Sequence, residues 1–302
     1  MMSRSAWFLS ICLLAVVAPA AAQDRVMPLQ DQHARDLEAR YANALPPNQF
    51  RLLGVDDGEF PALWIEQMTA NPQGGALIVH DDGQHPDWPR LIKDMRLYLP
   101  ENGWSTLAIS VPPRPSPPVP DRTTEDGETI PGSAAGSEAD PDFPPEISRR
   151  LQTGFDELSA NEGLLNVVLI GVGSGAVHTT RFLVEQLQLQ GIEEYGLGLV
   201  LVGAHERDTG ELMDLLANVS VPVLDVYLPG NRAREAAQQR RAAVLRNGLT
   251  TITQVQEQPW ATAHRSGPQV VTRRTWGWLR SNMTGRQDER LAGQGAVQEL
   301  ME

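Results

Sequence analysis

Apolar residues along the chain form short continuous runs separated by segments with helical spacing. The clearest runs are GALIVH at 75–80, WSTLAISV at 104–111, NVVLI at 166–170, LGLVLV at 197–202 and VPVLDVYL at 221–228. A continuous apolar run of this length is typical of a strand buried on both faces. Further strands are predicted at residues 51–55 and 61–68, around the turn at Asp57-Gly58, and at residues 250–256.

The segments between these runs have the spacing of amphipathic helices. In residues 88–99 the apolar stripe consists of Trp88, Leu91, Ile92, Met95 and Leu99. Further helices are predicted at residues 146–158, 174–189, 210–216, 232–245 and 268–280. Strands alternating with helices predict an α/β fold, a mostly parallel central sheet with helices on both faces. Ligands of such sheets bind beyond the carboxyl ends of the strands.

Both ends of the chain depart from this pattern. Arg4 precedes an apolar run at residues 7–17 and three alanines at 20–22, which predicts a signal peptide at residues 1–22. A retained anchor or a buried helix is the alternative. The polar residues 285–302 predict a loosely attached tail, so the folded domain is expected at residues 23–284.

Residues 112–145 interrupt the alternation inside the domain. They are rich in Pro, Gly, Ser and acidic residues and have almost no large apolar side chains. Such a segment cannot bury enough surface to fold, so it is expected to be a disordered insertion. It follows a central strand, where it is either a lid, a partner-binding segment or a tolerated surface insertion.

The net charge and the cysteine content exclude some classes of function. The formal net charge is −13, which argues against nucleic acid as a partner, because phosphate binding needs clustered Lys and Arg. Cys12 is the only cysteine and lies in the predicted signal peptide, so no disulfide or thiol nucleophile is expected after cleavage. We therefore expect an exported protein, periplasmic in a Gram-negative bacterium, with no membrane span once the signal is removed.

The stretch GVGSGA, residues 171–176, follows the strand at 166–170 and opens a helix. A strand, a glycine-rich turn and a helix are the setting of the hydrolase nucleophile elbow, G-x-S-x-G. With Gly171 and Gly175 as the flanking glycines, the nucleophile position is Gly173 and the serine follows it at Ser174. Glycine at this position keeps the strained backbone without the reactive oxygen. Ser174 is also a good N-cap residue for the helix.

Taken in order, these segments resemble the α/β-hydrolase superfamily over residues 51–280. The residues that carry the resemblance lie at 75–92, 103–112, 167–176, 221–227 and 263–279. Within the superfamily, the chain resembles a group of secreted bacterial proteins of unknown function. The resemblance implies a three-layer α/β sandwich, an oxyanion loop after the strand that ends in HDDG, and a serine, an acid and a histidine in that order along the chain.

The resemblance places the acid and the histidine after the later strands. His264 follows the last strand, where the superfamily keeps its general base. Asn231 stands at the expected acid position, and an amide cannot stabilise a histidine cation as a carboxylate does. Asp225, inside a strand, is the first alternative, with a structural role as the competing interpretation. Asp208 is a further alternative.

The loop HDDGQHPDW, residues 80–88, has three interpretations. The resemblance implies an oxyanion-type or substrate loop at His80, Asp81, Asp82 and Gly83. A metal site including His85 and Asp87 is disfavoured, because the spacing matches no helical ligand pair. Asp87 before Trp88 and Pro89 predicts a helix N-cap. No cofactor is expected, because the glycines of GVGSGA lack the dinucleotide-binding spacing and the chain has no P-loop.

Three hypotheses about function follow. The first is a non-catalytic envelope protein with a degenerate nucleophile elbow that binds a small molecule or an envelope protein through the cleft of the former site. The second is a serine esterase or other hydrolase in which Ser174 attacks an acyl carbon, His264 acts as base and Asp225 or Asp208 orients it. The third is an interaction scaffold that acts through residues 112–145. The first is favoured, because Gly173 and Asn231 both lack the expected catalytic group.

Overall fold

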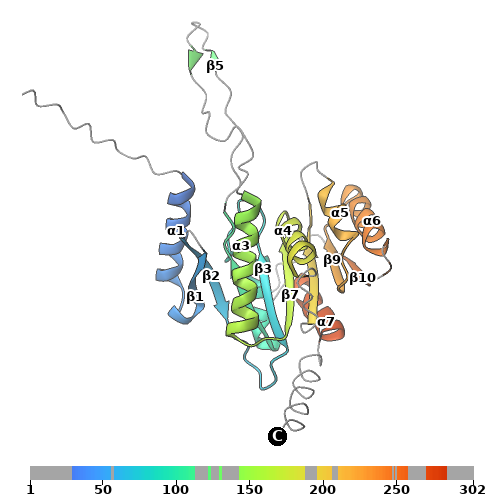
Figure 1. Ribbon diagram of the computed structural model, residues 1–302, viewed down its shortest axis with the longest axis horizontal. Coiled ribbons are helices and arrows are strands. Elements are labelled where there is room, and N and C mark those ends of the chain that lie inside the picture. Colours follow the sequence, from blue (N-terminus) through green and yellow to red (C-terminus); the bar gives the residue numbers. More distant parts are fainter. Residues whose placement is uncertain are drawn as a thin grey trace, which may run out of the picture.

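Eight strands form one mixed sheet in the order β1-β2-β4-β3-β7-β8-β9-β10 (Figure 1). The computed structural model describes residues 29–55, 58–112, 122–123, 129–130, 143–187, 196–205, 210–246, 248, 250–257 and 270–283. Two strands, β1 (Phe50–Val55) and β2 (Gly58–Ile65), form an antiparallel hairpin, and β2 pairs antiparallel with β4 (Trp104–Ile109). The other strands run parallel: β3 (Gly74–Val79), β7 (Asn166–Val172), β8 (Gly196–Val202), β9 (Val223–Tyr227) and β10 (Ile252–Gln256).

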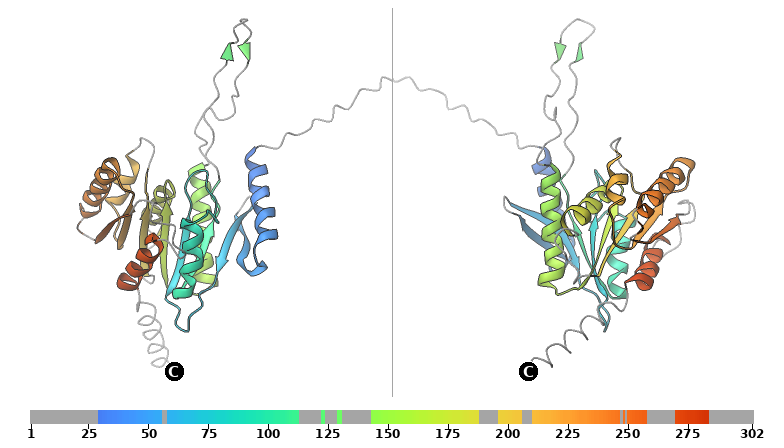
Figure 2. Two further views of the ribbon diagram at one scale, coloured as in Figure 1. Left: turned by 180° about the vertical axis from the view of Figure 1, so that it is seen from behind. Right: turned by 45° about the vertical axis from the view of Figure 1, so that its right-hand side comes forward.

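Helices cover both faces of the sheet (Figure 2). One face carries α3 (Phe143–Asp156), α4 (Gly175–Phe182), α5 (Glu211–Leu216) and α6 (Asn231–Leu245). The other carries α1 (Leu29–Ala44), α2 (Leu91–Tyr98) and α7 (Val270–Asn282). Shorter turns of helix are η1 (Pro47–Gln49), η2 (Pro100–Asn102), η3 (Glu157–Asn161) and η4 (Leu183–Leu187). The predicted three-layer α/β architecture with a mostly parallel sheet is confirmed.

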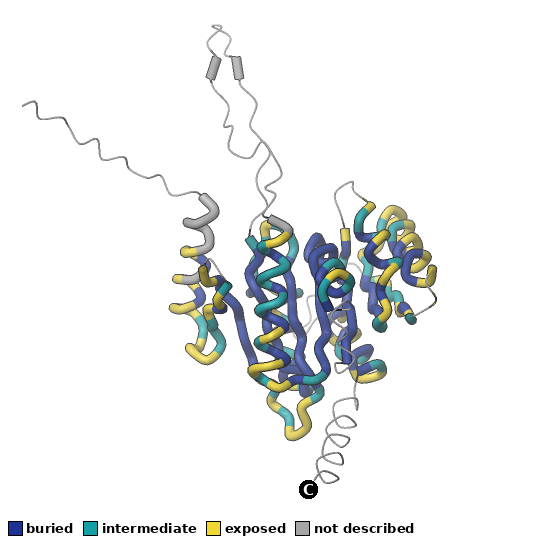
Figure 3. Tube along the Cα trace, viewed as in Figure 1, coloured by how far each residue is buried: buried dark blue, intermediate teal, exposed yellow. Residues whose placement is uncertain are grey.

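Alternation along the strands divides the buried side chains between the two faces. Leu77 and Val79 of β3 pack in the cluster under α3 and α4, whereas Ala76 and Ile78 pack in the cluster under α2 and α7. The central strands are buried along their whole length (Figure 3). Burial on both faces is the reason that these strands read as continuous apolar runs in the sequence.

Some helix boundaries differ from the predicted ones. Helix α2 begins at Leu91 rather than at Trp88, because the backbone of Arg90 has a φ of +70° and cannot continue a helix. The expectation that Asp87 caps this helix is therefore wrong. Its carboxylate instead lies 2.6 Å from Nη2 of the buried Arg96. Helix α1 is not predicted by the hydrophobic spacing, because its sequence is mostly polar.

The interruption at residues 112–145 is described only in part. Two short strands, β5 (Arg122–Thr123) and β6 (Thr129–Ile130), pair antiparallel within it, and α3 begins at Phe143, before the predicted end of the insertion. The predicted signal peptide and the predicted tail lie outside the described residues. Within the described part of the chain, no helix combines the length and the apolar character that a membrane crossing requires.

Candidate functional site

Three neighbouring strands, β3, β7 and β8, end at the same edge of the sheet, and their loops carry the candidate residues. Gly173 and Ser174 form the turn between β7 and α4. Gly173 has a φ of +58°, a left-handed conformation that glycine adopts without steric cost. A Cβ atom on Gly171 would lie 2.5 Å from Cα of Ala176, and one on Gly175 would lie 2.7 Å from the backbone carbonyl oxygens of Val79 and His80. The close packing of an elbow is therefore present.

The carboxylate of Asp81 occupies the space beside Gly173. A Cβ atom built on Gly173 would overlap with Cγ and both carboxylate oxygens of Asp81. In a nucleophile elbow this position carries the side chain that attacks the substrate. Asp81, from the loop after β3, thus stands where the nucleophile's own side chain would begin.

The same carboxylate also accepts hydrogen bonds from two backbone N–H groups. Oδ1 of Asp81 accepts hydrogen bonds from the N–H of Ser174 at 2.8 Å and from the N–H of Asp82 at 2.9 Å. In a hydrolase, the oxyanion hole consists of the N–H that follows the nucleophile and an N–H from the loop after the third strand. With Gly173 at the nucleophile position, these are the N–H groups of Ser174 and Asp82. Asp81 Oδ1 therefore binds both of these N–H groups.

The side chain of Ser174 is also hydrogen-bonded to this carboxylate. Its hydroxyl donates to Oδ1 of Asp81 at 2.8 Å and accepts the N–H of Asp82 at 2.9 Å, and the residue is buried. No side-chain hydrogen bond from Ser174 caps α4, so the N-cap interpretation does not describe its hydroxyl. Among the described residues, no histidine is hydrogen-bonded to Ser174 Oγ.

His205, in the loop after β8, completes the cluster. Its Nε2 lies 3.1 Å from Oδ2 of Asp81, and its side chain is 53% exposed, against 20% for Asp81. The order of contacts is therefore serine, carboxylate, histidine. A catalytic triad has the histidine between the serine and the carboxylate, so that it can carry the proton.

The surroundings of Asp81 keep it ionised. Burial alone would raise its pKa, but hydrogen bonds from His205 and from the backbone and hydroxyl of Ser174 outweigh burial and hold the pKa well below its ordinary value. A carboxylate with so low a proton affinity is a weak base. It cannot activate the Ser174 hydroxyl efficiently.

His80 fixes the loop that presents Asp81. Its Nε2 accepts the N–H of Val111 at 3.1 Å, so Nδ1 carries the proton and donates to the carbonyl oxygen of Asp81 at 2.8 Å. Complete burial lowers the pKa of His80 to about 4, so the ring is neutral at pH 7. Gly83 supports the turn with a φ of +74°, and the N–H of Gln84 also bonds to the Asp81 carbonyl at 3.0 Å.

Asp225 has partners of its own inside the structure. Nε and Nη2 of Arg240 each lie 3.0 Å from one oxygen of its carboxylate, and the amide nitrogen of Gln254 lies 2.9 Å from Oδ2. Asp225 is completely buried and Arg240 nearly so. This bidentate pair joins β9, β10 and α6, which is the arrangement expected of a structural carboxylate.

The remaining sequence candidates are placed as follows. Asn231 begins α6 on the surface, while His264 and Asp208 lie outside the described residues. Sequence reasoning missed His205, although it follows β8 at the edge where ligands of such sheets bind. The sequence pattern does not distinguish Asp81 from Asp82, because only the tertiary contact with Gly173 separates their roles. Over the described part of the chain, no cluster of three or more His, Cys, Asp or Glu side chains is arranged to hold a metal ion.

Comparison with known proteins identifies the family. Residues 7–281 match the family described as "Protein of unknown function (DUF3530)", and this match covers most of the chain. The chain therefore belongs to that family. Among curated protein sequences, none matches this chain.

Solved structures share the fold at low sequence identity. Est1E from Butyrivibrio proteoclasticus, solved with bound ferulic acid, is 11% identical, with a TM-score of 0.53 over 77% of this chain and 98% of that one. The esterase Pf2001 from Pyrococcus furiosus is 13% identical, with a TM-score of 0.50 over 78% and 92%. The esterase domain of a Rhodothermus marinus protein is 14% identical, with a TM-score of 0.50 over 78% and 98%. The chain has an α/β-hydrolase-like fold.

Proposed function

We propose that this DUF3530 protein is a non-catalytic, exported binding protein of the cell envelope that uses the site edge of an α/β-hydrolase fold to hold a small molecule or an envelope protein. The observation that carries the proposal is the position of Asp81. Its carboxylate stands in the nucleophile's place beside Gly173 and accepts the two N–H groups of an oxyanion hole.

Electrostatics supports this proposal. Acyl transfer develops negative charge on the substrate oxygen, and catalysis depends on free donors directed at that charge. Here the donors are already bound to Asp81, whose low pKa keeps it negative. An approaching oxyanion would meet a like charge in place of two N–H groups. Ser174 is a poor nucleophile as well, because its hydroxyl is tied to that carboxylate and has no hydrogen bond to a histidine among the described residues.

The proposed ligand contacts lie around His205, which is the most exposed member of the cluster. Its Nε2 lies against the ionised carboxylate of Asp81, and its exposed side chain is where a polar ligand group would make contact. Export to the envelope rests on the features of residues 1–22. The competing hypothesis is that residues 112–145 bind the partner. Deleting that segment would then abolish partner binding, whereas ligand binding at His205 would remain.

A fluorophosphonate probe tests the absence of catalysis. We expect no labelling of the wild-type protein, and none of Ser174→Ala. Wild-type labelling that disappears in Ser174→Ala would overturn the proposal in favour of a serine hydrolase. The double variant Asp81→Gly with Gly173→Ser is the positive comparison. It empties the space beside residue 173 and places a hydroxyl there.

Binding is tested by thermal shift with small carboxylic acids and esters. Under our proposal, a ligand that stabilises the wild type stabilises His205→Ala less. Equal stabilisation of both proteins would place the binding elsewhere.

A further inference from the structure

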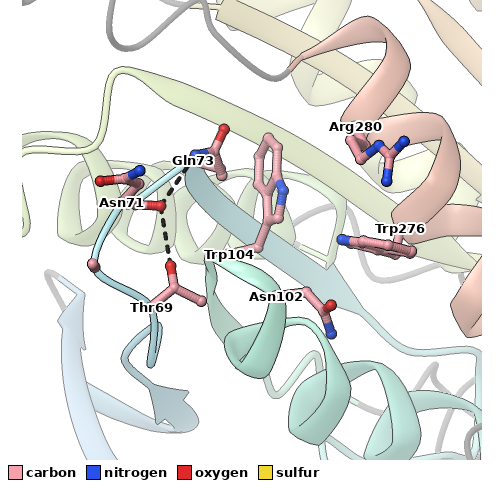
Figure 4. A pocket seen from close by; sticks show the side chains of 8 residues that line it. Thr69, Asn71, Gln73, Asn102, Trp104, Trp276 and Arg280 are labelled. Atoms are coloured by element: carbon pink, nitrogen blue, oxygen red, sulfur yellow. Dashed lines mark hydrogen bonds between the residues drawn. The ribbon is translucent and has the colours of Figure 1, made fainter.

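A pocket opens at the opposite edge of the sheet from Asp81, where β3 and β4 begin (Figure 4). Gln73, which precedes β3, lines the pocket, whereas His80 follows the same strand and belongs to the Asp81 site. Six residues of strand separate the two, about 20 Å. The pocket has a volume of about 320 Å³, and ligand pockets commonly measure about 300–1,000 Å³. It is therefore a separate place with room for a small ring.

Two tryptophans form the apolar part of the pocket. Trp104, at the start of β4, is almost completely buried and stands between the loop before β3 and helix α7 (Figure 4). Trp276 of α7 is half-buried, and the ring of Tyr98 packs edge-on against it at 6.3 Å between centroids. This contact holds the Trp276 ring in place, so the aromatic surface is formed before any ligand arrives.

Amide side chains surround the aromatic part. Asn71 and Gln73 come from the loop before β3, and Asn102 comes from η2. The amide nitrogen of Gln73 donates to the Asn71 carbonyl at 3.1 Å, and that of Asn102 donates to the Tyr98 carbonyl at 2.8 Å. Neither amide oxygen, Gln73 Oε1 or Asn102 Oδ1, accepts a hydrogen bond from the residues that the structure describes. Each amide thus offers a ligand both a donor and an acceptor.

One positive charge lies at the pocket. The guanidinium of Arg280 is 5.6 Å from the centre of the Trp276 ring, one turn further along α7. Within the described ranges, it has this ring contact and neither a hydrogen bond nor an ion pair. A guanidinium has a fork of donors that matches a carboxylate.

We propose that this pocket binds a saccharide unit that carries a carboxylate. The apolar face of a sugar ring packs on the aromatic ring of Trp276, and its hydroxyls, each both donor and acceptor, match the amides of Asn71, Gln73 and Asn102. Arg280 binds the carboxylate. A flat aromatic acid would use Trp276 and Arg280 but would make no hydrogen bonds with the three amides, so it matches less of the pocket.

The test is a binding titration of the full-length mature chain with three probes at one ionic strength: trigalacturonate, a neutral glucose trimer and benzoate. We expect trigalacturonate to bind most tightly, the neutral trimer about 10-fold or more weakly and benzoate not at all. Benzoate binding as tight as that of trigalacturonate, or no binding of either saccharide, would overturn the proposal.

Variants connect the binding to the pocket. Trp276→Leu should abolish binding of both saccharides, and Arg280→Gln should reduce trigalacturonate to the affinity of the neutral trimer. Arg273→Gln is the matched control, since Arg273 is exposed on the same helix and does not line the pocket. Circular dichroism verifies the folding of each variant. An equal loss in Arg273→Gln and Arg280→Gln would show that the charge acts at long range, and would overturn the assigned role of Arg280.

Discussion

The carboxylate of Asp81 fills the space that any side chain on Gly173 would need. The two residues come from loops after neighbouring strands and depend on each other. Glycine at position 173 makes room for the carboxylate, and the carboxylate satisfies the backbone donors that the elbow turns toward that space. The carboxylate of Asp81 thus fills the space beside the turn between β7 and α4.

Gly173→Ala should destabilise the fold more than its backbone conformation alone explains. A side chain at a left-handed φ costs about 1–2 kcal/mol, and overlap with Asp81 adds to that cost. Urea unfolding measures the difference. Gly83→Ala is the matched control, because Gly83 has a φ of +74° with nothing within 4 Å of its Cβ position. Equal losses in the two variants would contradict the tight fit between Gly173 and Asp81.

Combining Gly173→Ala with Asp81→Gly should recover part of that stability. Removing the carboxylate relieves the overlap, so the two substitutions should not be additive in a double-mutant cycle. Strict additivity of the two free energies of unfolding would mean that the side chains do not compete for the same space.

The stability of the protein should fall between pH 6.5 and pH 4 because of His80. Its pKa is about 4 in the folded protein, against an ordinary value of 6.5 in the unfolded chain, so the unfolded chain binds the proton first as the pH falls. The contribution of the neutral His80 to the free energy of unfolding is complete above pH 6.5, and about 3 kcal/mol of it is lost by pH 4. The measurement is urea unfolding as a function of pH. His80→Gln should flatten this part of the curve, and a variant curve parallel to the wild type would contradict a neutral, buried His80.

A second loss of stability, below about pH 4, should come from Asp81. Its folded pKa lies below the ordinary value of 3.8, so it stabilises the fold above that pH and loses this effect as the pH falls toward the folded pKa. Asp81→Asn should remove the dependence on pH in this lower range only. An unchanged curve for Asp81→Asn would show that its hydrogen bonds do not favour the charged form.

Arg240→Met should destabilise the protein by about 3–5 kcal/mol, because it leaves the buried Asp225 carboxylate without its partner. Combining it with Asp225→Leu should restore much of the loss. Arg241→Met is the control on the same helix, since Arg241 is exposed. Chemical unfolding gives all three values, and a small effect of Arg240→Met alone would argue against a buried pair.

The layers of this fold can be predicted from the hydrophobic pattern alone. Continuous runs such as 75–80 and 197–202 read as strands because both of their faces are buried, and the glycines at 171, 173 and 175 predicted a tight strand-turn-helix. Helix α1 and the start of α2 were missed, because a weakly apolar helix and a left-handed Arg90 leave little mark on hydrophobic spacing. Hydrophobic spacing predicts a helix or its boundary only where one face is strongly buried.

The neighbours of Gly173, in contrast, follow from the packing of distant segments. Asp81 lies 92 positions before Gly173, and His205 lies 32 positions after it, so no spacing along the chain relates them. The parallel pairing of β3, β7 and β8 brings their loops together at one edge. The backbone direction and the space that Gly173 leaves determine which of the two aspartates in HDDG lies beside this turn. Which residue becomes the partner of Asp225 was likewise settled by the packing of α6 on β9, because a buried carboxylate must find a charged donor within reach.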